Sequence, residues 1–103
     1  MQTSERRQHP RVVVACPARV FDTRHRLLVK GKTVDISAGG VKVMGPAVRE
    51  PEPGTQVEVK IDLILPDSRQ LRQVERRATI RRVETLGDWT AVALEFSRPV
   101  EIE

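Results

Sequence analysis

The segment Asp35-Ile36-Ser37-Ala38-Gly39-Gly40 holds the residue types from which a site for a polar, planar ligand can be built. It lies between two strand-like runs, so Asp35 and Ser37 project from the same side of an extended backbone. One offers a carboxylate and the other a hydroxyl. Gly39 and Gly40 allow the backbone either to turn at positive φ or to come close to a flat ligand. Taken alone, the segment is equally well explained as a β-turn with an Asx hydrogen bond.

A second group of candidate residues lies near the N-terminus, where Arg7 and Arg11 are four residues apart. Pro10 disfavours a helix through this segment. On an extended backbone the two arginines lie on one face, with Cα atoms roughly 13 Å apart. Guanidinium groups suit phosphate-bearing and planar partners. Taken alone, the pair is most simply a flexible basic arm without a specific role.

Catalysis and metal binding have little support in the sequence. His9 and His25 are not spaced as a metal-binding pair, and Ser37 has no nearby histidine to act as a base. The single cysteine, Cys16, excludes a disulfide framework, and its apolar surroundings predict a small buried hydrophobe. Neither a phosphate-loop nor a dinucleotide glycine fingerprint is present. We therefore expect no catalytic residues, no metal, no cofactor and no enzymatic activity.

The composition predicts one small globular domain rich in strands. The chain has 103 residues, of which 39% are hydrophobic and 31% charged. Aromatic residues make up only 3%, so the core must consist mainly of valine, isoleucine, leucine and alanine, which favours β-structure. The net charge of +4 comes from arginine, which supplies 14 of the 18 basic residues. Nothing resembles a signal peptide or a membrane-spanning run, so we expect a cytoplasmic protein without membrane insertion.

The elements that must position these residues are short strands separated by turn signals. The expected strands cover residues 12–21, 27–36, 41–44, 57–65, 71–84 and 89–96. Within 71–84 the register is ambiguous, because Ala78 and Ile80 share a side with Arg76 and Arg82. The pattern predicts an all-β fold, a six-stranded antiparallel β-barrel over residues 12–103, preceded by a flexible N-terminal arm over 1–11. Residues 97–103 are too short and too proline-broken for a substantial C-terminal helix.

The two candidate groups, taken together and in this order, resemble the two signatures of PilZ domains. The family pattern is RxxxR in an N-terminal arm, followed by [D/N]xSxxG after the second strand. In this sequence the matching residues are Arg7, Arg11, Asp35, Ser37 and Gly40. The resemblance covers residues 6 to about 96 and implies a split-barrel type of six-stranded fold. It also implies binding of cyclic di-GMP, a bacterial second messenger with two phosphates and two guanines.

The resemblance assigns a role to each arginine of the arm. Arg7 and Arg11 are expected to reach the ligand's phosphates and to lay their guanidinium planes on guanine. Arg6, directly before the motif, often accompanies binding of two stacked cyclic di-GMP molecules in the family, so one or two molecules remain open. Ligand binding is expected to order the arm across the barrel and to change the surface offered to a downstream protein partner.

The same resemblance assigns roles to the glycine segment. Asp35 is expected to accept hydrogen bonds from a guanine edge, and Ser37 to contact guanine or phosphate. Gly39 and Gly40 are expected to allow close approach of the backbone.

Two other functions compete with that of a cyclic di-GMP receptor. The first is a basic barrel that binds single-stranded nucleic acid through a strand face lined by Arg72, Arg76, Arg77, Arg81 and Arg82. Such proteins usually stack bases on aromatic side chains, and this chain has only Phe21, Trp89 and Phe96, so we do not expect a nucleic-acid partner. The second is a PilZ-fold protein-interaction module that no longer needs the nucleotide. Because the sequence retains both motifs, we prefer the receptor.

Overall fold

The protein is described by a computed structural model that covers residues 11–12, 15–64 and 71–100, and every regular element in these residues is a β-strand. The strands are β1 (Arg11–Val12), β2 (Pro17–Phe21), β3 (Leu27–Ser37), β4 (Gly40–Gly45), β5 (Gln56–Ile64), β6 (Leu71–Leu86) and β7 (Trp89–Phe96). The predicted all-β class is confirmed. Arg11 lies in β1, whereas the rest of the expected arm lies outside the described residues.

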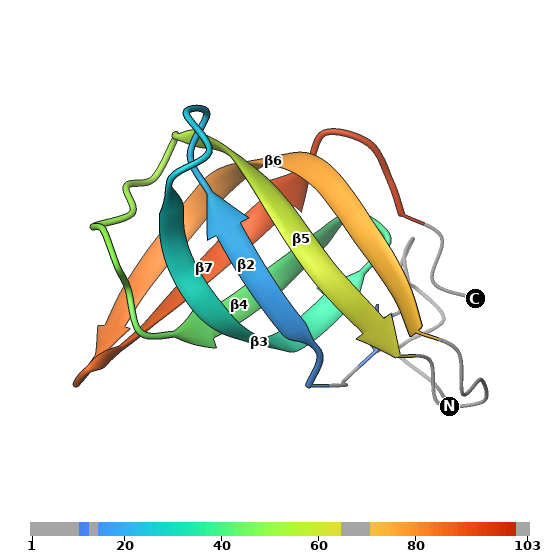
Figure 1. The fold of residues 1–103 in the computed structure, drawn as a ribbon, viewed down its shortest axis with the longest axis horizontal. Helices are drawn as coiled ribbons and strands as arrows, with labels where there is room; N and C mark the ends of the chain where they lie inside the picture. Colours follow the sequence, from blue (N-terminus) through green and yellow to red (C-terminus); the bar gives the residue numbers. More distant parts are fainter. Residues whose placement is uncertain (1–10, 13–14, 65–70, 101–103) are drawn as a thin grey trace, which may run out of the picture.

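Six of the strands close into an antiparallel barrel (Figure 1). They follow the order β3-β2-β5-β6-β7-β4, and β4 pairs back onto β3 to complete the ring. The two-residue β1 pairs with β3 on the side of β3 that also holds β2. The single strand expected over 12–21 is therefore split, and β2 begins at Pro17, which has no backbone N–H to give to a continuous ladder.

Alternating apolar residues fill the barrel. The expected inward set of β5, Val57, Val59, Ile61 and Leu63, is buried throughout, and Phe96 of β7 is buried with it. Cys16 is completely buried, as its surroundings predicted. Its backbone N–H donates to the Thr33 hydroxyl oxygen at 2.9 Å, which satisfies a polar group that would otherwise be costly to bury.

The ambiguous register of β6 is resolved by a β-bulge at Arg81. Ile80 pairs with Leu94, but the next pair joins Arg82 to Ala93, so Arg81 is an extra residue. Before the bulge the even-numbered Ala78 and Ile80 face the core. After it, Val83 packs against the core, and Arg82 is exposed. Arg82 therefore does not share a side with Ile80, contrary to the strict alternation assumed from the sequence.

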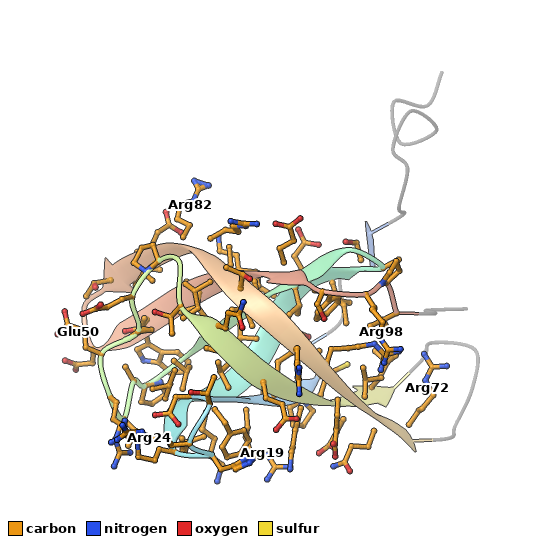
Figure 2. The ribbon with its side chains drawn as sticks, turned by 90° about the horizontal axis from the view of Figure 1, so that it is seen from above. Arg19, Arg24, Glu50, Arg72, Arg82 and Arg98 are labelled. Carbon is orange, nitrogen blue, oxygen red and sulfur yellow. The ribbon has the colours of Figure 1, made fainter. Side chains whose placement is uncertain are left out.

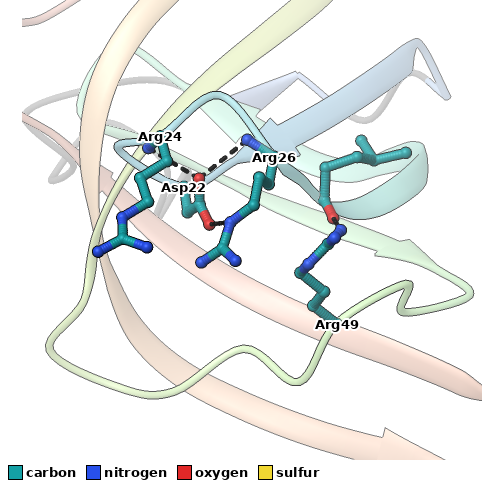
Figure 3. Close-up of polar contacts among 5 residues, drawn as sticks. Asp22, Arg24, Arg26 and Arg49 are labelled. Carbon is teal, nitrogen blue, oxygen red and sulfur yellow. Dashed lines mark hydrogen bonds and ion pairs between the residues drawn. The ribbon is translucent and has the colours of Figure 1, made fainter.

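A polar cap holds the turn between β2 and β3 (Figure 3). Oδ1 of Asp22 accepts the backbone N–H groups of Arg24 at 2.8 Å and Arg26 at 2.9 Å, while Nε of Arg26 donates to Oδ2 at 2.8 Å. These hydrogen bonds, with the Arg26 backbone contribution largest, lower the pKa of Asp22 below its ordinary value. Nη1 of Arg49 donates to the Leu27 carbonyl at 3.3 Å, which ties the loop after β4 to this turn.

The chain that follows β7 bends at residues 97–98 and packs against one end of the barrel. Val100 is buried, and its N–H donates to the Ala38 carbonyl at 2.9 Å. Figure 1 shows this segment at the end of the barrel opposite the loop that joins β4 to β5. The described residues contain no helix, and therefore no helix that could cross a membrane.

Candidate functional site

The segment Ser37–Gly40, which joins β3 to β4, forms a corner held on several sides. The Gly39 N–H donates to Oγ of Ser37 at 3.3 Å, and that hydroxyl lies 3.5 Å from the Gly40 carbonyl oxygen. The Gly39 carbonyl accepts the N–H of Phe96 at 2.9 Å. With the Ala38–Val100 hydrogen bond, the corner is tied to β7 and to the chain that follows it. Its backbone is thus positioned before any ligand arrives.

Gly40 is required by packing within the barrel. Positive φ angles among the described glycines occur at Gly54 and Gly87, so neither Gly39 nor Gly40 turns the chain in that way. A Cβ atom placed on Gly40 would lie 2.5 Å from the carbonyl oxygen of Leu94, which is closer than such atoms can come. Of the two roles considered for these glycines, the positive-φ turn is therefore excluded, and close approach of two backbones explains the motif glycine Gly40.

Asp35 and Ser37 lie on the outer face of the barrel, on the same side of β3. Both are half-buried, and Ile36 between them is fully buried in the core. A bulge at Val34, between the pairs Thr33–Val43 and Asp35–Lys42, sets this phase. The spacing of two residues thus brings the carboxylate and the hydroxyl to one surface, as the sequence predicted.

Arg11, the second arginine of the N-terminal motif, is paired with Ser37. The Cα partners across β1 and β3 are Arg11 with Ser37 and Val12 with Ile36. Arg11 lies 24 residues before Asp35 in the sequence. The pairing of β1 with β3 nevertheless brings these parts of the two motifs onto adjacent strands. Arg6 and Arg7 lie outside the described residues.

A hollow of about 350 Å³ lies beside this corner. It is lined by Asp35, Ser37, Gly40, Val41, Lys42, Arg82, Ala93 and Leu94. Lys42 is not among the predicted site residues, although its outward position between the inward-facing Val41 and Val43 follows from strand alternation. Arg82 was considered only as one of five arginines on a possible nucleic-acid-binding strand face. The bulge that brings Arg82 to this hollow has no clear signature in the sequence.

Size does not single out this hollow, because two others are larger. One of about 530 Å³ lies beside the β2–β3 turn and is lined by Asp22, His25, Glu58 and Arg77 among others. Another of about 480 Å³ is mostly apolar and includes Val34 and Trp89. The 350 Å³ hollow is distinguished by chemistry, since it alone of these three contains residues of the glycine corner.

The five arginines proposed for nucleic-acid binding do not form one face. Arg72 and Arg76 are half-buried and lie on the inward side of β6 with Val74, opposite the buried Leu63 and Val59. Arg77, Arg81 and Arg82 are exposed. Figure 2 shows Arg82 and Arg72 toward opposite ends of the barrel. Within the described residues, no group of three or more His, Cys, Asp or Glu side chains could hold a metal ion.

A closed six-stranded barrel, with an Asp-x-Ser-x-x-Gly corner on its outer face and an RxxxR arginine paired to it, defines a small β-barrel domain of the PilZ type. The PilZ domain model matches residues 5–103, and the chain belongs to the PilZ domain family. Members of this family act as binding modules in cyclic di-GMP signalling. The predicted family and fold are therefore confirmed.

A solved structure has a similar fold. The fold is similar to that of the Bacillus subtilis inhibitor of motility (MotI/DgrA), with a TM-score of 0.73 and 24% sequence identity. The match covers 97% of this chain and 45% of that protein, so the chain spans less than half the length of its structural neighbour. At this identity the likeness concerns the fold. Among curated proteins, none matches the sequence.

Proposed function

We propose that this domain is a receptor for cyclic di-GMP, with Arg6, Arg7, Arg11, Asp35, Ser37, Gly39 and Gly40 as its ligand-binding residues. The observation that carries the proposal is the pairing of Arg11 with Ser37, which brings the two family motifs to one place on the barrel. Arginine side chains from β1 and the arm contact the phosphates and stack on guanine. Asp35 accepts hydrogen bonds from guanine N–H groups, and the fixed corner offers backbone to the ligand without rearrangement.

Binding in this scheme orders the N-terminal arm across the corner. The second arginine of the motif, Arg11, is paired with β3, and in this scheme the ligand's phosphates bind the first, Arg7. The arm then covers part of β3 and changes the surface that a downstream protein meets. Limited digestion with trypsin tests this step, because the bonds after Arg6, Arg7 and Arg11 should be cleaved more slowly with ligand bound.

Isothermal titration calorimetry tests the receptor function directly. The wild-type chain is titrated with cyclic di-GMP, and with GTP and the linear dinucleotide as controls. The expected result is saturable binding of cyclic di-GMP alone, at one or two molecules per chain. Equal heats from all three nucleotides, or none from cyclic di-GMP, would contradict the proposal and favour the protein-interaction module.

A further inference from the structure

We infer that the ligand surface extends beyond the two motifs, along a row of residues that crosses four strands of the barrel. The row consists of Asp35 on β3, Lys42 on β4, Ala93 on β7 and Arg82 on β6. We propose that Lys42 and Arg82 bind a phosphate of the ligand over Ala93, and that Glu84 opposes this binding by holding Lys42. The inference rests on the proposed function and names residues that neither motif contains.

The pairing register places these residues side by side. Asp35 pairs with Lys42, Lys42 pairs with Ala93, and Ala93 pairs with Arg82. Neighbouring strands are about 4.8 Å apart, so the backbones at Lys42 and Arg82 are separated by roughly 10 Å. All four residues line the 350 Å³ hollow. The row therefore begins at a motif residue and continues with two cations.

The small side chain in the middle of the row creates the space. Ala93 is half-buried on the outer face, between the buried Val92 and Leu94. Alanine is an uncommon choice for a strand, where larger β-branched residues pack better. Here its small side chain leaves space between Lys42 and Arg82 that a planar or anionic group can occupy. A larger side chain at this position would fill the hollow.

Lys42 and Arg82 differ in whether their side chains already form an ion pair. Nζ of Lys42 lies 3.4 Å from Oε1 of Glu84, and both side chains are partly exposed. Arg82 has no hydrogen bond or ion pair from its side chain to any residue that the structure describes, and Figure 2 shows it pointing away from the barrel. An arriving phosphate would thus bind Arg82 without breaking an ion pair, whereas it must compete with Glu84 for Lys42.

The bulge at Arg81 is what brings a guanidinium to the row. Without it, residue 82 would face the core with Ile80, as strict alternation requires. Arg81 itself is engaged elsewhere, because its Nε donates to Oε1 of Glu95 at 2.6 Å. Arg81 therefore provides a matched control of the same residue type, next in sequence and outside the lining of the hollow.

The test is a calorimetric titration of cyclic di-GMP into the wild type and four variants. Arg82→Gln and Lys42→Gln should each raise Kd about tenfold, while Arg81→Gln should stay within twofold of the wild type. Ala93→Leu should abolish binding by filling the hollow. Circular dichroism confirms that each variant retains the barrel, which is expected because the replaced side chains face outward.

The outcomes separate this inference from the proposed function. Wild-type binding with unchanged affinity in Arg82→Gln and Lys42→Gln would overturn the row and leave the receptor standing. A wild type that binds no cyclic di-GMP would overturn both. Glu84→Gln tests the competition, because removing the carboxylate frees Lys42 and should lower Kd several-fold. An unchanged or higher Kd in Glu84→Gln would overturn the role of Glu84.

Discussion

Arg11 and Ser37 are direct Cα partners across β1 and β3, so one residue of each family motif faces the other on adjacent strands. Removing the guanidinium by Arg11→Ala should weaken binding of cyclic di-GMP tenfold or more, because a hydrogen bond to a charged group contributes roughly 1.5–3 kcal/mol. A thermal-shift titration measures the loss. At ligand near one hundred times Kd, the wild type should gain about 2.7 kcal/mol, which is several degrees for a domain of this size.

Arg24→Ala is the matched control for that experiment. Arg24 is exposed in the β2–β3 turn, and its side chain does not line the hollow beside the glycine corner. Its ligand-induced shift should equal that of the wild type. Equal shifts in Arg11→Ala and Arg24→Ala would mean that the arginine paired with Ser37 does not touch the ligand.

The motif glycine should matter even without ligand. In Gly40→Ala, the added Cβ would lie 2.5 Å from the Leu94 carbonyl oxygen, and β4 and β7 would have to separate to accept it. We expect a loss of about 1–3 kcal/mol of unfolding free energy in the ligand-free protein, typical of an overpacked site. Urea denaturation measures it. Full stability with impaired binding would instead show that Gly40 serves only the ligand.

The buried hydroxyl of Thr33 should stabilise the start of the barrel. Its oxygen accepts the Cys16 N–H at 2.9 Å where both residues are buried. Thr33→Val keeps the shape and removes this acceptor, so it should cost about 1–3 kcal/mol. Chemical denaturation checks the value against Thr85→Val, an exposed strand position where little change is expected. Equal stabilities of the two variants would refute the role of this hydrogen bond.

The sequence predicted the barrel because its strands are strongly patterned. The alternation of Val57, Val59, Ile61 and Leu63 required one buried face, and the turn signals divided the rest of the chain. The two motifs, in their chain order, indicated the family. The meeting of Arg11 and Ser37 itself required the register of β1 against β3, which pairs residues distant in sequence.

Some features of the fold could not be predicted from the sequence, because they depend on single extra residues inserted in a strand. A bulge adds one residue to a strand and reverses which side chains face the core beyond it. At Arg81 this reversal turned Arg82 outward and moved Val83 inward. The hollow over Ala93 follows from the pairing of four strands, of which only β6 and β7, and β3 and β4, are neighbours along the chain. Sequence periodicity predicts neither the position of a bulge nor which strands pair.

The cap formed by Asp22 should make stability depend on pH in the acid range. Because hydrogen bonds from Arg26 and Arg24 favour the ionised carboxylate, the folded protein holds the pKa of Asp22 below its unfolded value, near 3.8. The resulting stabilisation is complete above that unfolded value and is lost as the pH falls through the lower folded pKa. Asp22→Asn retains an acceptor oxygen but removes the charge. It should therefore melt at a lower temperature than the wild type at pH 7, and the difference in melting temperature should shrink below pH 4.

Asp88→Asn, in the exposed β6–β7 turn, is the control and should follow the wild-type curve of melting temperature against pH. A constant difference between Asp22→Asn and the wild type from pH 7 to pH 2 would show that the charge of Asp22 does not stabilise the turn.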